Sequence, residues 1–163
     1  VQIIKKQNKL SDKIKKIIGL VWGKTPPFLR QKIVRSTQKK FTVSVAAIVL
    51  NKKDEVLLLN HTLRPYYNWG LPGGFINHGE QPADVLRREL REETGIELKN
   101  VEMIRIRTLH RHIEIMFRAE SDGKAAVKSH EIIDVGWFRA DNLPERLSEI
   151  QKNFIQNFLS NGF

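Results

Sequence analysis

Apolar residues with helical spacing mark the first forty positions of this chain. A helix is predicted over 12–22, with Ser11 as its N-cap, and Gly23 and the two prolines after it should end it. A second short helix is predicted over 28–35. In the first helix the apolar positions recur every three or four residues and form one stripe, made of Ile14, Ile17, Ile18 and Val21.

From residue 42 onward the helical spacing is replaced by short runs that are rich in β-branched residues or that alternate apolar and polar residues. They predict strands over 42–50, 55–59, 101–107, 113–119 and 132–138. A turn over 51–54 should join the first two strands as a hairpin. The stretch 62–79 is rich in glycine and proline and is predicted to be a loop.

Helices interrupt these strands at two places. One is predicted over 82–94, and the other is a C-terminal helix whose apolar stripe consists of Leu147, Ile150, Phe154, Phe158 and Leu159. Hairpins combined with few helices favour the α+β class, with a mixed β-sheet sandwiched between helices.

The formal net charge of +10 is unevenly distributed. Residues 1–40 carry twelve Lys or Arg and one acid, Asp12, for a net charge of +11, whereas residues 41–163 carry sixteen bases and seventeen acids. We therefore divide the chain into a basic helical N-terminal extension, 1–40, and a domain, 41–163. The basic isoelectric point does not indicate that the domain binds nucleic acid.

Composition excludes several kinds of protein. The chain has no cysteine, so disulfides, thiol catalysis and thiolate metal ligands are excluded. The longest apolar run, 45–50, is far shorter than the ~20 residues of a membrane span. The lysine-rich start lacks the apolar core of a secretory signal. We expect a soluble, cytoplasmic protein.

The predicted helix 82–94 has two distinct faces. Pro82 suits a first helical turn and Gly95 suits a left-handed stop. Steps of about 100° per residue place the core-facing positions on one side; these are Ala83, Leu86, Leu90 and Thr94.

A neighbouring face of the same helix carries three carboxylates, Glu89, Glu92 and Glu93. At this spacing they repel one another, and a hard divalent cation relieves that repulsion. Arg88 lies four residues before Glu92 and can orient it. Their pattern predicts a magnesium or manganese site, although three such acids outside any motif would usually form a solvated helix face.

The segment from Gly74 to Ile96 resembles the Nudix box at every specified position, which are Gly74, Glu80, Arg88, Glu89, Leu90, Glu92, Glu93, Gly95 and Ile96. The likeness extends over about 41–163. It includes the Trp-Gly-Leu-Pro-Gly-Gly lead-in that begins at Trp69 and the Gly-Trp-Phe sequence that begins at Gly136. Residues 1–40 lie outside it.

The resemblance implies a Nudix-type α/β/α fold and a Nudix hydrolase that uses Mg²⁺ or Mn²⁺ to cleave a phosphoanhydride bond. It implies metal binding by Glu89, Glu92 and Glu93, with the loop at Gly74 helping to form the site. Arg88 joins these glutamates in the expected catalytic set. The family varies in its general base, which is either a box glutamate or a downstream one, and Glu131 precedes a predicted strand where such a base can lie.

Candidates for substrate binding are weaker. Arg64 and Arg107 are suited to phosphate, Gly73 allows close backbone approach, and Trp69 could stack on a base or belong to the core. His110 and His112 flank an expected turn and are predicted to be solvated.

The substrate follows less directly than the reaction. His110 to Ile115 lacks the proline of ADP-ribose hydrolases and the tyrosine of dinucleoside polyphosphate hydrolases. We expect a nucleoside diphosphate linked to another moiety, such as a nucleotide sugar. Alternatives are nucleoside triphosphate cleanup, a non-catalytic nucleotide-sensing Nudix module, and an RNA-directed Nudix hydrolase. The intact carboxylates argue against the sensing module.

The extension, 1–40, has three candidate partners. Its apolar stripe can dock on the domain or on a second subunit in a homodimer, which is the expectation we favour. It can also lie on an anionic membrane surface, or its lysines can bind nucleic acid, for which the segment has few aromatics. An eleven-residue helix offers little area to a membrane and is marginal alone in water.

Overall fold

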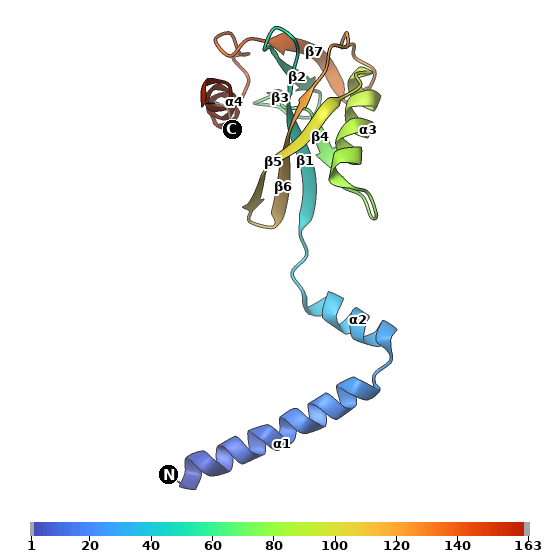
Figure 1. Cartoon of the computed structure of the whole chain (residues 1–163), viewed down its shortest axis with the longest axis vertical. Coiled ribbons are helices and arrows are strands. Elements are labelled where there is room, and N and C mark those ends of the chain that lie inside the picture. Colours follow the sequence, from blue (N-terminus) through green and yellow to red (C-terminus); the bar gives the residue numbers. More distant parts are fainter. Residues whose placement is uncertain (1, 162–163) are drawn as a thin grey trace. The chain divides into compact units, whose positions relative to one another are not determined.

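The computed structural model describes residues 2–161, with side chains described from residue 11 to residue 160. Contacts between Cα atoms divide the chain into two units, residues 1–40 and residues 41–163. The elements of both units are labelled in Figure 1.

The first unit contains two helices, α1 (Gln2–Lys24) and α2 (Pro27–Thr37). The predicted start of α1 at residue 12 is wrong, because Ser11 lies inside the helix and not at its N-cap. Residues 2–10 contain neither Gly nor Pro and include lysine, glutamine and leucine, which favour helix, so nothing stops α1 from extending through them. Its end precedes Pro26, as predicted.

A mixed sheet forms the second unit. Its central strands are ordered β3-β2-β1-β6-β5, with β4 paired to β1 and β7 paired to β2. The bounds are β1 (Thr42–Leu50), β2 (Val56–His61), β3 (Trp69–Gly70), β4 (Gly73–Phe75), β5 (Lys99–Leu109), β6 (His112–Glu120) and β7 (Ile132–Phe138). β1 runs parallel to β6 along its whole length and antiparallel to β2 and β4.

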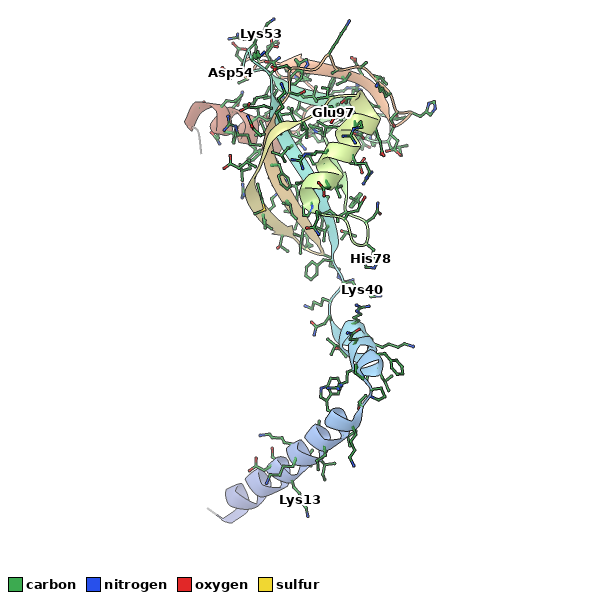
Figure 2. The ribbon with its side chains drawn as sticks, turned by 45° about the vertical axis from the view of Figure 1, so that its right-hand side comes forward. Lys13, Lys40, Lys53, Asp54, His78 and Glu97 are labelled. Carbon is green, nitrogen blue, oxygen red and sulfur yellow. The ribbon has the colours of Figure 1, made fainter. Side chains whose placement is uncertain are left out.

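The turn predicted over 51–54 joins β1 to β2 as an antiparallel hairpin. The Asn51 side-chain oxygen accepts hydrogen bonds from the backbone N–H groups of Lys53 and Glu55, at 2.8 and 3.1 Å. Asp54 takes a positive φ of 57°. Short polar residues tolerate this conformation, which explains the tight turn that carries Lys53 and Asp54 (Figure 2).

Strand β1 builds both halves of the core. Its odd-numbered residues, such as Ala47, pack against α3 (Pro82–Thr94), and even-numbered residues, such as Ile48, pack toward α4 (Glu149–Asn161). Because strand side chains alternate between the two faces, one strand supplies both clusters. The two helices cover opposite faces of the sheet (Figure 1), which confirms the predicted α+β sandwich.

Two details of the sequence prediction are wrong. Residues 62–79 are not entirely loop, since they contain β3 and β4, which are too short to show alternation. In the C-terminal stripe Ile150 is 71% exposed, and Ile155 is fully buried. Helix α4 begins after Leu147, so the helical phase drawn from Leu147 does not hold, although Leu147 itself is fully buried.

Candidate active site

Helix α3 is held in place by one apolar face. Val85, Leu86 and Leu90 are buried in the cluster that includes the odd-numbered residues of β1. The helix ends at Gly95, whose φ of 72° is the left-handed conformation expected there. The predicted core face is confirmed at Leu86, Leu90 and Thr94, and Ala83 packs at its edge.

The three carboxylates of α3 differ in exposure. Glu93 is 6% exposed, the Glu89 side chain is 20% exposed, and the Glu92 side chain is 59% exposed. The gradient follows from helical position, because Glu93 lies seven residues after Leu86 and three after Leu90, close to the buried face. Glu92 lies two residues after Leu90 and is turned toward solvent.

The glycines of β4 bring the strands and this helix into close contact. β4 pairs with β1, with Gly73 opposite Ala46 and Gly74 opposite Val45. A Cβ atom at Gly73 would collide with the Val45 carbonyl oxygen, and one at Gly74 would collide with the carboxyl group of Glu89. Only glycine therefore allows the Glu89 carboxylate to lie against the backbone of β4.

Burial changes the acidity of the inner carboxylates. Desolvation, with the charges of Glu89 and Glu131, raises the pKa of Glu93 to about 7, against the opposing effect of Arg64. Burial also raises the pKa of Glu89, against the opposing effect of Arg88. Oε2 of Glu93 is buried and has no hydrogen-bond partner among the described residues. Negative charge thus accumulates where solvent does not compensate it.

Arg88 is the main counter-charge on the helix. Its guanidinium lies 3.1 Å from Glu80, 3.0 Å from Glu89 and 3.2 Å from Glu92, measured between the paired nitrogen and oxygen atoms. The pKa of Glu80 is lowered mainly by a hydrogen bond from the Asn77 backbone N–H and, to a smaller extent, by Arg88. The direct contact of Arg88 with Glu92 supports the predicted role of Arg88 in orienting that carboxylate.

One cavity of about 530 Å³ adjoins these groups. Seven of the residues singled out from the sequence line it: Arg64, Gly73, Gly74, Glu89, Glu93, Arg107 and Glu131. Glu131 directly precedes β7, as predicted. It therefore reaches the same cavity as Glu89 and Glu93 from a different part of the chain. Arg88, Glu92 and Trp69 do not belong to the lining.

Trp69 belongs to the core and not to the cavity wall. Its ring meets Phe138 edge to face, with ring centroids 5.0 Å apart, and it packs on the buried cluster that includes Leu147 and Ile155. Of the two roles considered for Trp69, stacking on a base or packing in the core, this packing supports the core role.

Several lining residues were not found from the sequence. His112, which we expected to be solvated, is half-buried, and its ring nitrogens lie within hydrogen-bond distance of the hydroxyls of Thr42 and Ser44, at 2.8 and 2.9 Å. The parallel pairing of β1 with β6 creates this contact, which sequence spacing does not reveal. His61 also lines the cavity, and burial, aided by Arg64, lowers its pKa to about 4.

The donor set suits a hard divalent cation. Carboxylate oxygens are the ligands preferred by Mg²⁺ and Mn²⁺, and the unpartnered oxygen of Glu93 next to Glu89 lacks only a positive partner. Across the described residues, no three acidic or histidine side chains are already arranged around one point. Arg88 accounts for part of this, because it draws Glu89 and Glu92 toward its own guanidinium.

Comparison with known proteins agrees with this geometry. The model of the NUDIX domain family matches residues 40–158, which is most of the chain. The chain belongs to the Nudix hydrolase family. Hydrolases of this family act on acid anhydrides in phosphorus-containing substrates, as the resemblance implied.

Individual Nudix proteins share part of this chain. It is 30% identical over 120 residues to the 8-oxo-dGDP phosphatase NUDT18 of Danio rerio, covering 69% of this chain and 37% of that protein. It is 29% identical over 100 residues to the NAD-capped RNA hydrolase NudC of Erwinia tasmaniensis, covering 60% of this chain and 38% of that protein. The chain therefore spans less than two fifths of the length of either.

A solved structure shares the fold. A NUDIX hydrolase from Nitrosomonas europaea superimposes with a TM-score of 0.67 at 21% identity, covering 77% of this chain and 73% of that one.

The buried charge predicts that Glu93→Gln stabilises the metal-free protein at pH 8. The pKa of Glu93 in the folded protein, about 7, lies above the ordinary value of 4.5. Proton binding by Glu93 therefore stabilises the folded protein fully below pH 4.5, and this stabilisation is lost as the pH rises through 7. Glutamine carries no charge, and we expect a melting temperature about 3 °C higher at pH 8, with a smaller difference at pH 5. Thermal scans in a chelator measure this.

Glu97→Gln is the matched control. Arg91 lowers the pKa of Glu97 through a hydrogen bond, so the control should not gain stability at pH 8. A Glu93→Gln protein that melts at or below the parental temperature at pH 8 would show that the burial of this carboxylate carries no cost.

Proposed function

We propose that this Nudix hydrolase uses Mg²⁺ or Mn²⁺ to cleave a phosphoanhydride bond in a nucleoside diphosphate linked to another moiety, such as a nucleotide sugar. The main support is that Glu89, Glu93 and Glu131 meet Arg64 and Arg107 at one cavity. Carboxylates for a metal and guanidiniums for phosphates are the two charge types that phosphoanhydride cleavage requires.

The metal ligands in this proposal are Glu89, Glu92 and Glu93, of which Glu92 does not line the cavity and pairs with Arg88. Arg88 is a positioning residue, because it contacts Glu89 and Glu92 without lining the cavity. Gly74 is needed so that the Glu89 carboxylate can lie against β4. When bound, the metal supplies charge neutralisation for the diphosphate and makes a water molecule more acidic.

Glu131 is the proposed general base. Its side chain is exposed, which lets it exchange a proton with bulk solvent, and its charge acts on both Glu89 and Glu93. A carboxylate placed between the metal ligands and solvent can take a proton from water and then release it. Glu89 is the alternative base.

Phosphate charge is met by arginines from two parts of the chain. The guanidinium of Arg64 lies against the backbone at Gly70, and Arg107 of β5 is held by an ion pair with Glu114 of the neighbouring strand. Gly73 lines the same cavity. Phe75 and Phe154 add apolar surface on which a base can lie.

The choice of substrate rests on the chemistry of the linkage. The two relatives described above are named for 8-oxo-dGDP and for NAD-capped RNA, and both dGDP and NAD contain a diphosphate. A cavity of about 530 Å³ lies within the size range of small-ligand sites. Nucleoside triphosphate cleanup is the second candidate.

Loss of the carboxylate ligands should abolish most of the activity. Either Glu92→Gln or Glu93→Gln is expected to lower turnover by at least ~100-fold, because each removes an anionic oxygen from the metal site. Phosphate release in Mg²⁺ or Mn²⁺ measures the effect. Glu97 is an exposed acid beyond the end of α3 (Figure 2), and the Glu97→Gln variant should retain parental turnover. Full activity in excess chelator would contradict the metal requirement.

Replacing the proposed base should separate catalysis from metal binding. Glu131→Gln is expected to lower turnover by ~10²–10⁴-fold with little change in metal affinity. The measurements are single-turnover rates and a Mn²⁺ titration. Asp134→Asn, three residues along β7 and outside the cavity lining, is the control. Parental turnover in Glu131→Gln would transfer the role to Glu89.

A substrate panel tests the linkage. Nucleotide sugars, dinucleotides and nucleoside triphosphates should be compared by kcat/KM, and we expect the highest values for diphosphates joined to a second moiety. A clear preference for triphosphates, with no cleavage of nucleotide sugars, would support the cleanup function instead.

A further inference from the structure

The apolar side chains of α1 have no covering surface within their own unit. In residues 11–40 no described side chain is buried. The members of the stripe, Ile14, Ile17, Ile18 and Val21, are about half exposed or more, and the neighbouring Trp22 is 39% exposed. Exposed apolar residues that gather on one side of a helix indicate a surface that binds something.

Apolar and basic side chains lie on different sides of α1. At about 100° per residue, Ile14, Ile17, Ile18, Val21 and Trp22 fall within an arc of about 140°. The opposite side carries Lys13 and Lys16, and Lys15 and Lys24 border the apolar arc on its two edges. Figure 2 shows Lys13 extending from the helix.

We propose that residues 1–40 bind the surface of an anionic lipid bilayer, with α1 lying in the plane of the interface. An interfacial helix needs an apolar face to enter the acyl boundary, basic residues at its edges for anionic headgroups, and an aromatic at that boundary. Trp22 supplies the aromatic. Among the described helices none is long and apolar enough to cross the bilayer.

The observed length of α1 removes one objection to this partner. The eleven residues predicted from the sequence would be marginal as a helix in water, whereas α1 has 23 residues, about 34 Å in length. The net charge of +11 over residues 1–40 matches an anionic surface, and each Lys or Arg close to such a surface strengthens binding.

Two other partners fit the same residues less well. Pairing α1 with a second copy of itself would bring the lysines bordering both apolar arcs together, which is unfavourable for like charges. Binding to nucleic acid would use the lysines but leave the apolar arc in water, and the described part of the unit offers only Trp22 and Phe28 for stacking.

The test measures binding of the full chain to lipid vesicles. Vesicles of phosphatidylcholine with about 30% phosphatidylserine should bind the protein, and pure phosphatidylcholine should bind it at least tenfold more weakly. Raising the salt concentration should weaken binding to the anionic vesicles, because exposed charges are screened. Absence of binding to the anionic vesicles would overturn the proposal.

A matched pair of variants tests the orientation of α1. Ile18 lies in the apolar arc and Leu20 lies on the lysine side, and their exposures are similar, 60% and 66%. Ile18→Gln should weaken vesicle binding about fivefold, whereas Leu20→Gln should change it less than twofold. Both should keep the parental helical circular dichroism, since neither residue is buried.

The remaining outcomes contradict the proposal. Equal loss of binding in both variants would show that the apolar arc does not face the lipid. A parental dimer that Ile18→Gln converts to a monomer, without vesicle binding, would assign α1 to a second copy. Tighter binding to single-stranded RNA than to vesicles, unaffected by Ile18→Gln, would assign the unit to nucleic acid.

Discussion

The close packing of the β4 backbone between β1 and the carboxyl group of Glu89 determines where that carboxylate can lie. Gly73 touches the Val45 carbonyl and Gly74 touches the Glu89 carboxylate, and neither position has room for a Cβ atom. A larger residue at Gly73 would disturb the pairing of β4 with β1, and one at Gly74 would force the Glu89 carboxylate away from β4.

This packing leaves charge in a place where water cannot fully reach it. Glu93 is almost completely buried beside Glu89, and the cost appears as a pKa near 7. Arg88 pairs with Glu89 and Glu92 and not with Glu93; the Arg88 side chain is 32% exposed and the Glu92 side chain is 59% exposed. Such pairs contribute little to stability, so a metal can displace them at small cost. The inner carboxylate has no such substitute partner.

The sequence predicted most of the fold because its signals were local. The carboxylates of α3, its buried face and the glycine that ends it all lie within one helical segment and its next residue, where spacing alone determines which side chains share a face. The end of α1 was predicted equally well from Pro26. Its start was not, because Ser11 suggested an N-cap and the lysines before it were not recognised as helical.

What could not be predicted depended on pairing between distant segments. His112 reaches Ser44 because β6 runs parallel to β1. Glu131 was a candidate from the family resemblance, but its place at the cavity depends on the pairing of β7 with β2. Neither pairing has a marker at short range. The same limit applies to Trp69 and Ile150, whose packing depends on where α4 begins.

The separation of charge between the two units has its own physical consequence. The domain is almost neutral, with one more acid than base, so no general positive field draws phosphate to it. Attraction must come from the arginines that line the cavity, at short range and beside carboxylates that need a cation. In physiological salt, charges act over about 8 Å, so each lysine of residues 1–40 affects mainly the groups that lie within about that distance of it.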